Sequence, residues 1–322
     1  MLPAIKKLST IFIFFGLFSI FASLPISAFP HFDNDGKADL AVFRRSDRNW
    51  YVFSSEDKSF SATQWGLTTD KLVPGDYDGD GLTDYAVWRP QTGIWYVLRS
   101  SDKTLFTQKW GMQPVAPPQT ISFLSTDEPV AADYDGDSVT DFAVWRPDTG
   151  VWYILKSTDN FSQNNPQIFR WGMLGDIPVP ADYDGDGKAD YAIFRGNLWY
   201  IFQSQSASWR VVNFGRQGDD LLVPADYTGD GKTDIAVYRK GIWFIERSDN
   251  GQTETYNFGL SSDIPVPADY DGDKKTDVAV YRNGVWYILK SSTAQMEVFN
   301  FGRSGDIPLS SLNVKQSIVG IP

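Results

Sequence analysis

An aspartate-rich loop followed directly by a short apolar strand occurs six times along this chain, at intervals of about 50 residues. We number the loops 1 to 6: 31–39, 76–84, 133–141, 182–190, 226–234 and 269–277. After each loop come the strand, a Trp-aromatic pair such as Trp95-Tyr96, and an aromatic-Gly pair such as Trp110-Gly111. A period of this length with several short strands per unit is typical of a β-propeller or a similar array.

The first 28 residues differ from the repeats. Lys6 and Lys7 precede an apolar run over 11–24, which is followed by Ile26-Ser27-Ala28. This pattern predicts a secretory signal peptide (1–28) cleaved after Ala28, which leaves 29–322 as one repeat domain in an extracytoplasmic compartment. The alternative is an uncleaved membrane anchor, but the run is shorter than the roughly 20 residues that a bilayer span needs, so we expect no membrane span in the mature chain.

Composition narrows the partners and the means of stabilisation. The chain contains no Cys, so neither disulfides nor a lipid on a cysteine can hold it. Its formal net charge is -11, which excludes nucleic acid as an expected partner because phosphate binding needs a basic face. More than half of the 40 acidic residues lie in the six loops. Such a patterned excess of carboxylates indicates metal sites.

Loop 2 shows the chemistry of these loops most fully. Its sequence, DYDGDGLTD, places carboxylates at positions 1, 3, 5 and 9 and glycine at positions 4 and 6. Anionic oxygens at alternating positions of a tight turn suit a hard cation, and calcium fits best because it accepts six to eight oxygen ligands in flexible geometry. We expect the backbone carbonyl at position 7 to contribute a further ligand. An EF-hand is excluded, because position 12 is Val87 rather than Glu and no helices flank the loop. The alternative is a set of Asx-rich turns without metal.

The predicted site thus holds up to six Ca²⁺ ions. The ligands assigned to it are Asp33, Asp35 and Asp39; Asp76, Asp78, Asp80, Leu82 and Asp84; Asp133, Asp135, Asp137, Val139 and Asp141; Asp182, Asp184, Asp186, Lys188 and Asp190; Asp226, Asp230, Lys232 and Asp234; and Asp269, Asp271, Asp273, Lys275 and Asp277. His31 occupies position 1 of loop 1 and Thr228 occupies position 3 of loop 5. We therefore predict weaker calcium binding in loops 1 and 5.

The loops, their following strands and the aromatic-Gly pairs resemble FG-GAP (VCBS-type) repeats over about residues 30 to 310. Those repeats form the propeller of integrin α-subunits and many secreted bacterial propellers. The resemblance implies an all-β propeller of four-stranded blades, in which each loop joins the first two strands of a blade and binds calcium. Integrin propellers have seven blades, whereas this chain has six loops.

The ends of the chain suggest how the ring closes. The inter-blade signature appears once more at 305–311 with no loop after it, so we predict that this C-terminal segment supplies the innermost strand of the first blade. Six blades result; seven with one degenerate blade is the alternative. Strands such as Tyr85–Arg89 are apolar on both faces, as burial between neighbouring blades requires. We expect the Trp-aromatic pairs to be core rather than sugar platforms, and the recurring Arg after each strand to pair, between blades, with the Asp before each loop.

Departures from the repeat are the better places to look for a ligand site. A Pro-rich insertion covers 113–119, and the turns at 90–93 and 147–150 are longer than their counterparts. These segments predict a binding site on the face opposite the calcium loops, around the second and third blades, with Gln91, Asp148, Gln113 and Gln119 as candidates. Ordinary variation of loop length is the alternative.

Catalytic signals are scarce, since the chain has one His, no Cys and no nucleophile elbow. No catalytic residue is assigned. The leading interpretation is a secreted, monomeric, calcium-stabilised interaction or adhesion module with an extracellular protein or glycan as partner. A lectin is the second, with Trp88, Trp145 or Trp209 stacking on sugars. A polysaccharide lyase is a distant third.

Overall fold

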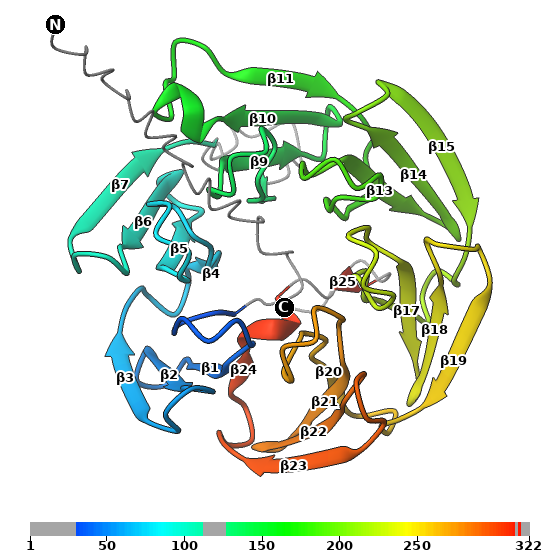
Figure 1. The fold of residues 1–322 in the computed structure, drawn as a ribbon. Helices are drawn as coiled ribbons and strands as arrows, with labels where there is room; N and C mark the ends of the chain where they lie inside the picture. Colours follow the sequence, from blue (N-terminus) through cyan, green and yellow to red (C-terminus); the bar gives the residue numbers. More distant parts are fainter. Residues whose placement is uncertain (1–29, 112–126, 313–314, 317–322) are drawn as a thin grey trace, which may run out of the picture.

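The computed structural model describes residues 30–111, 127–312 and 315–316. Six antiparallel sheets stand around a common axis and form a closed ring (Figure 1). The fold is an all-β propeller with six four-stranded blades, as the repeat predicted, and the seven-blade alternative is wrong. No α-helix occurs in these ranges, which contain only the short 3-10 helices η2 (Ser157–Asp159) and η3 (Leu309–Ser311).

Each blade runs from a two-residue innermost strand to an exposed outer strand. In this order the blades are β24 (Ile307–Pro308), β1 (Leu40–Arg44), β2 (Asn49–Phe53) and β3 (Phe60–Gln64); β4 (Lys71–Leu72), β5 (Tyr85–Arg89), β6 (Ile94–Leu98) and β7 (Leu105–Lys109); β8 (Glu128–Pro129), β9 (Phe142–Arg146), β10 (Val151–Leu155) and β11 (Gln167–Arg170); β12 (Ile177–Pro178), β13 (Tyr191–Arg195), β14 (Leu198–Gln203) and β15 (Ser208–Asn213); β16 (Leu221–Leu222), β17 (Ile235–Arg239), β18 (Ile242–Glu246) and β19 (Thr253–Asn257); and β20 (Ile264–Pro265), β21 (Val278–Arg282), β22 (Val285–Leu289) and β23 (Met296–Asn300).

The two ends of the chain meet in blade 1. Strand β24 pairs with β1 in the register Val42 to Pro308 and Phe43 to Ile307, so the C-terminal segment closes the ring as predicted. A further short strand, β25 (Lys315–Gln316), pairs with β16 of blade 5, which the sequence did not suggest. Closure matters because an unpaired innermost edge would expose backbone donors and acceptors to other chains.

Burial falls stepwise across a blade. The first four residues of each second strand are buried, the third strand alternates, and the outer strand is largely exposed. The apolar residues form six core clusters, and each cluster joins two neighbouring blades. The second strands are therefore apolar on both faces because each face packs against a blade.

The Trp and aromatic-Gly pairs are parts of one structural unit. The six indoles are fully buried, and each Nε1–H donates to the carbonyl of the aromatic residue before the glycine, as in Trp95 to Trp110 at 3.0 Å. The glycine that follows adopts positive φ; Gly66, for example, has φ +83°, and a Cβ there would lie 2.9 Å from the side chain of Val87. The Trp of each pair is thus core, as expected, and its buried indole has the hydrogen-bond acceptor that it needs, while the second aromatic of each pair is half-buried.

The recurring Arg and Asp residues pair with each other. Arg89, for example, donates from Nε and Nη2 to the two carboxylate oxygens of Asp70, both at 2.9 Å. The partner lies in the connection that leads into the same blade, so the expected pairing between blades is wrong in that detail. Blade 1 follows the same rule, but its two partners come from opposite ends of the chain: Arg44 pairs with Asp306, which leads into β24, across 262 residues.

No helix within the described ranges is long and apolar enough to cross a membrane. The predicted signal peptide, 1–28, lies outside the described residues.

Candidate metal centres

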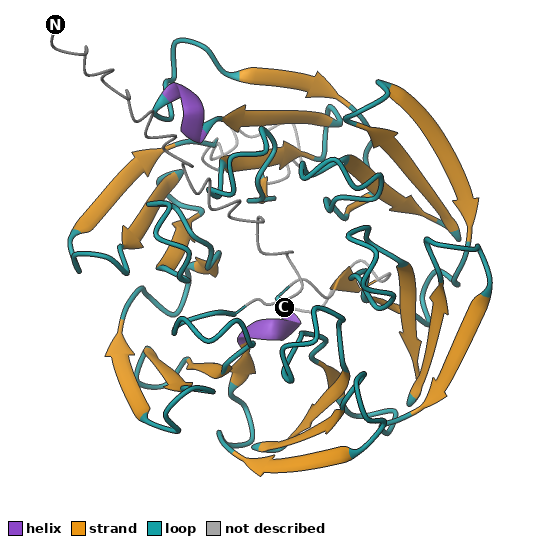
Figure 2. Cartoon of the chain, viewed as in Figure 1, coloured by secondary structure: helices purple, strands orange, loops and turns teal. Residues whose placement is uncertain are grey.

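All six aspartate loops lie on one face of the ring, and each leads into the second strand of a blade; loops 2 to 6 connect that strand to the innermost one. They gather around the axis of the propeller, where Figure 2 shows the inner loops. The turn between the third and outer strands reaches the same face and contacts the loop of its own blade; in blade 2, Ser100 Oγ bonds to Asp80 at 2.8 Å. Each candidate site is therefore built from a loop and a hairpin turn.

Loop 2 shows how the sequence bends the backbone. The carboxylate of Asp76 accepts the backbone N–H of Gly79 at 2.6 Å and of Gly81 at 2.8 Å, which folds the loop around its first residue. Asp80 Oδ1 accepts the N–H of Leu82 at 2.9 Å. Gly79 and Gly81 have φ +78° and +85°, a region that residues with a Cβ rarely adopt.

The aspartate at position 9 ties the loop to the hairpin turn. Asp84 is 0 % exposed, and its two carboxylate oxygens accept the N–H of Tyr77 at 2.9 Å and of Ser100 at 2.6 Å. The same two bonds recur in every other loop. Position 9 thus has a structural role in addition to any ligand role.

The structure brings many, but not all, of the predicted ligands together. In five loops, three ligand atoms lie within 4.8 Å of one another and could hold a metal ion. The groups are His31, Asp33 and Asp35; Asp76, Asp78 and Asp84; Asp133, Asp135 and Asp141; Asp182, Asp184 and Asp190; and Asp269, Asp271 and Asp273. The fifth-position aspartates of loops 2 to 4 and the ninth-position aspartates of loops 1 and 6 lie outside these groups.

The position-3 aspartates carry the clearest sign of a cation. One oxygen of Asp78 accepts the hydroxyl of Ser101 at 2.6 Å, whereas Oδ1 is buried and has no hydrogen-bond partner in the part of the chain that the structure describes. Oδ1 of Asp135 and Oδ1 of Asp184 are likewise buried without a hydrogen-bond partner among the described residues. A buried carboxylate oxygen without a partner costs free energy unless a cation compensates it. These residues fit a hard divalent ion, because every ligand atom in the three groups is an oxygen.

The electrostatics agree with this fit. Burial raises the pKa of Asp84 to about 7, and the negative charge of Asp78 adds to the rise. Burial likewise raises the pKa of Asp141, Asp190 and Asp277 to about 7 and that of Asp39 to about 6. Without a cation these position-9 carboxyls resist ionisation, and a bound cation would favour their ionised form.

Neighbouring loops are joined in a ring of their own. The N–H at position 8 donates to the carbonyl at position 1 of the preceding loop, as in Thr140 to Asp76 at 2.5 Å. The bond occurs six times in all, and the one from Ala38 to Asp269, at 2.7 Å, completes the circle. The position-7 side chain lies over the position-4 residue of the preceding loop; that of Lys188, for example, would be 3.1 Å from a Cβ at Gly136. Metal binding by the position-7 carbonyls stays a prediction; these are the carbonyls of Leu82, Val139, Lys188, Lys232 and Lys275.

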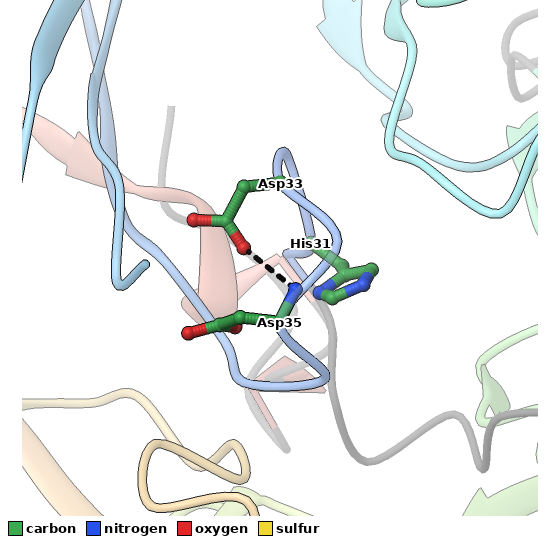
Figure 3. Close-up of side chains that lie close together, drawn as sticks. All are labelled: His31, Asp33 and Asp35. Carbon is green, nitrogen blue, oxygen red and sulfur yellow. Dashed lines mark hydrogen bonds between the residues drawn. The ribbon is translucent and has the colours of Figure 1, made fainter. Parts of the chain in front are cut away.

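Loops 1 and 5 depart from the others as their sequences indicated. Loop 5, which is fully described, yields no such three-residue group, because Thr228 stands where other loops have Asp; its hydroxyl lies 3.2 Å from that of Ser248. In loop 1 the imidazole of His31 joins the carboxylates of Asp33 and Asp35 (Figure 3).

The hydroxyl groups of the hairpin turns were not identified from the sequence as part of the candidate metal sites. Ser54, Ser101, Thr158 and Ser292 donate to the position-3 carboxylate of their own blades. The signal was present, because a Ser follows the third strand closely in every repeat.

The predicted ligand site on the opposite face stays a prediction. Gln91 and Asp148 lie in the turns between the second and third strands of blades 2 and 3, on the face away from the loops. Gln113 and Gln119 lie outside the described residues.

Two of the proposed sugar-stacking residues do not qualify. Trp88 and Trp145 are 0 % and 1 % exposed, because they lie in strands packed on both faces, so their assignment as exposed platforms is wrong. Trp209 in β15 is 64 % exposed.

A cavity of about 280 Å³ lies on the metal-loop face between blades 4 and 5. It is lined by polar side chains that include Gln203, Gln205, Arg210 and Lys232. Arg210 Nε is buried there, and within the described ranges it has no hydrogen-bond partner. No glycan or protein site was predicted from the sequence in this cavity; of its lining residues, only Asp184 and Lys232 were assigned a role, as metal ligands.

A family model described as an FG-GAP-like repeat matches residues 31–87, 76–144 and 133–193, half of the chain in all. Each match begins at the first residue of an aspartate loop. No curated protein matches the chain in sequence.

Solved structures match the fold at low sequence identity. An Agrocybe aegerita lectin, described in a study of specific recognition of non-reducing terminal N-acetylglucosamine, is 14 % identical, with 87 % of this chain and 78 % of the lectin covered and a TM-score of 0.55. TolB from Acinetobacter baumannii is 10 % identical, with 84 % of this chain and 63 % of TolB covered and a TM-score of 0.54. At such identities the likeness shows the fold alone.

Proposed function

This chain belongs to the FG-GAP-like repeat family, and we propose that it is a secreted, non-catalytic interaction module whose propeller is stabilised by calcium. Its partner would be an extracellular protein or glycan, and it would act as a monomer made of residues 29–322 after cleavage behind Ala28. The observation that carries the calcium proposal is the set of buried, unpartnered carboxylate oxygens on Asp78, Asp135 and Asp184.

Calcium is favoured over magnesium by the character of these loops. Their candidate ligands are carboxylates that partly accept backbone N–H groups, calcium tolerates such irregular oxygen geometry, and Mg²⁺ would keep more of its waters than calcium does. Calcium in a site near the axis would neutralise carboxylates that burial otherwise holds near protonation. The ions would therefore stabilise the ring in the role that disulfides play in other exported domains.

A calcium titration of metal-free protein by calorimetry tests the proposal. We expect binding in loops 2, 3, 4 and 6 and a higher melting temperature with calcium. Asp78→Asn should reduce the stoichiometry by one, whereas Asp102→Asn, in the exposed hairpin turn of the same blade, should leave it unchanged. Protein that shows neither heat of binding nor a thermal shift at millimolar calcium would refute the calcium role.

Carbohydrate binding is the second candidate, and the cavity between blades 4 and 5 favours it. Gln203, Gln205 and Ser206 offer both donors and acceptors for hydroxyl groups, while Arg210 Nε offers a buried donor. Mixed donors and acceptors of this kind suit a polyhydroxylated ligand. The Agrocybe aegerita lectin, whose described ligand is a sugar, adds support through its similar fold.

A glycan array with and without calcium separates the two candidates. Selective binding that Arg210→Leu abolishes would support a lectin with its site in this cavity. Binding that is lost instead in Trp209→Ala would place the sugar on the outer strand. An array without signal, from folded calcium-loaded protein, would favour a protein partner.

A further inference from the structure

Loop 1 differs from the other five loops in the chemistry of its first residue. His31 is the only histidine of the chain, and it occupies the position that Asp holds in loops 2 to 6. The His31 side chain does not lie on the surface, because the residue is only 6 % exposed. The imidazole therefore stands inside the loop, where an acidic oxygen stands elsewhere.

The hydrogen bonds of His31 assign its two ring nitrogens to different roles. Nδ1 lies 3.0 Å from the carbonyl oxygen of Lys37. Because a carbonyl only accepts, Nδ1 carries the proton, and in the neutral ring Nε2 keeps a lone pair. Nε2 is buried and has no hydrogen-bond partner among the described residues. Histidines that bind metals commonly donate their other ring N–H to a backbone carbonyl in this way.

Two carboxylates accompany the imidazole. A ring nitrogen of His31 and carboxylate oxygens of Asp33 and Asp35 lie within 4.8 Å of one another (Figure 3). Asp33 Oδ2 accepts the hydroxyl of Ser54 at 2.6 Å, and Asp35 Oδ1 accepts that of Ser55 at 2.9 Å. These outer partners fix the orientation of both carboxylates before any ion arrives.

We propose that loop 1 is a transition-metal site, for a divalent ion such as Zn²⁺, rather than a weakened calcium site. One imidazole nitrogen and two carboxylate oxygens leave coordination positions open for water or a partner's ligand. Imidazole suits Zn²⁺, Fe²⁺, Ni²⁺ and Cu²⁺, whereas calcium takes oxygen ligands. The inference rests on the proposal that these loops hold cations, but it needs only loop 1 to do so.

Two kinds of metal would then lie on one ring. Loop 1 is joined to loop 6 by the bond from Ala38 to Asp269 and to loop 2 by the bond from Thr83 to His31, which is 2.6 Å long. His31 thus contributes its carbonyl to the ring of loops while its imidazole is available for the ion. A transition metal in loop 1 would sit between two calcium loops and stabilise the blade where the chain closes.

The test is a Zn²⁺ titration of tag-free protein by calorimetry in saturating calcium, with Co²⁺ absorption as a second readout. We expect one Zn²⁺ per chain and a visible Co²⁺ band. His31→Asp restores the residue of the other loops, so the variant should fold and bind one more Ca²⁺. Its Zn²⁺ affinity should fall by about 10- to 100-fold or more, because removing even an outer-shell partner of a metal ligand has an effect of that size. Asp78→Asn in loop 2 is the matched control, which should lose a Ca²⁺ and keep the Zn²⁺.

The outcomes separate this inference from the calcium proposal. Calcium binding without Zn²⁺ binding, or Zn²⁺ binding that survives in His31→Asp, would overturn the transition-metal site and leave the calcium proposal intact. If the protein binds Zn²⁺ through His31 but does not bind calcium, the transition-metal site in loop 1 is supported and the calcium role is refuted. Because the chain has a single histidine, the imidazole NMR signals report on this site alone.

Discussion

The ion pair between Arg44 and Asp306, which we call the clasp, joins the two ends of the chain in blade 1. Removing it tests how the propeller is held closed. Nε and Nη2 of Arg44 donate to the two carboxylate oxygens of Asp306, both at 2.8 Å, and the guanidinium stacks over Tyr51 at 4.2 Å. Asp306 is 5 % exposed. The variant Arg44→Ala leaves this carboxylate buried with only the N–H of Arg303, at 2.8 Å, as a recorded donor.

The expected magnitude follows from that geometry. Removing one partner of a buried ion pair costs about 3 to 5 kcal/mol, because the other charge stays buried without compensation. For a domain of this size each kcal/mol corresponds to roughly 2 °C in melting temperature. We therefore expect Arg44→Ala to melt about 6 to 10 °C lower. Calcium stoichiometry should not change, since neither residue contacts a loop carboxylate.

Arg89→Ala is the matched control, because the pair of Arg89 and Asp70 repeats the clasp inside blade 2. Its two bonds are 2.9 Å long, Asp70 is also 5 % exposed, and the guanidinium stacks over Tyr96 at 4.3 Å. The two partners, however, are 19 residues apart rather than 262. The local cost should therefore be similar, while only Arg44→Ala loosens the seam between the chain ends.

Calorimetry gives the melting temperatures, and hydrogen exchange followed by mass spectrometry locates the opening. In Arg44→Ala the amides of β1 that face β24 should exchange faster; in Arg89→Ala they should match the parent protein. Equal exchange at the seam in both variants would show that the clasp does not hold the ring closed. A fall in calcium stoichiometry in either variant would contradict the structural assignment of the pairs.

Three further predictions concern the loops and turns. The pKa of Asp84 is raised to about 7 in the fold and stays near 3.8 in the unfolded chain, so the folded metal-free protein binds more protons between about pH 4 and 7. Its stability should fall as pH rises through that window, by about 1.4 kcal/mol per pH unit for each such carboxyl, and calcium should reverse the trend; a flat melting profile in metal-free buffers would contradict this. Thr228→Asp should add one calcium per chain by calorimetry, whereas Thr228→Ser should add none. Gly150→Ala, with a Cβ 2.1 Å from the carbonyl oxygen of Gly172, should lower the free energy of unfolding in urea by more than Gly187→Ala, which shares positive φ but meets nothing within 4 Å; equal losses would remove the clash argument.

Much of the fold follows from the repeat alone. The apolar strand after each loop has the bounds expected from its residues, as with Tyr85–Arg89, because apolar character on both faces leaves no place for it except between blades. The extra inter-blade signature at 305–311 predicted the closing strand for a related reason: no aspartate loop follows it. Local sequence specifies these features, so they could be predicted without coordinates.

The errors arise where contacts depend on neighbouring blades. Trp88 and Trp145 are next to last in their strands, each followed by a charged Arg, and from this position they were proposed as exposed sugar platforms. In the fold their rings are covered, and the Nε1 of Trp88 donates to the carbonyl of Trp110 at 3.1 Å. The cavity beside Arg210 was missed for the same reason, because it exists only where blade 4 meets blade 5.

The ring of bonds between loops gives the metal sites a significance that no single loop reveals. The position-1 carbonyl of every loop accepts the N–H of the next loop, as that of Asp76 does for Thr140, and in loops 1 to 4 and 6 the position-1 side chain also belongs to the candidate metal group. An ion that fixes one loop therefore also fixes the acceptor for its neighbour, and the ordering cost of the neighbour falls. In His31 the same backbone bond is kept while the side-chain chemistry changes. The backbone of position 1 thus links the ring in every loop, and under our proposals the side chain of the same residue sets which ion its loop would hold.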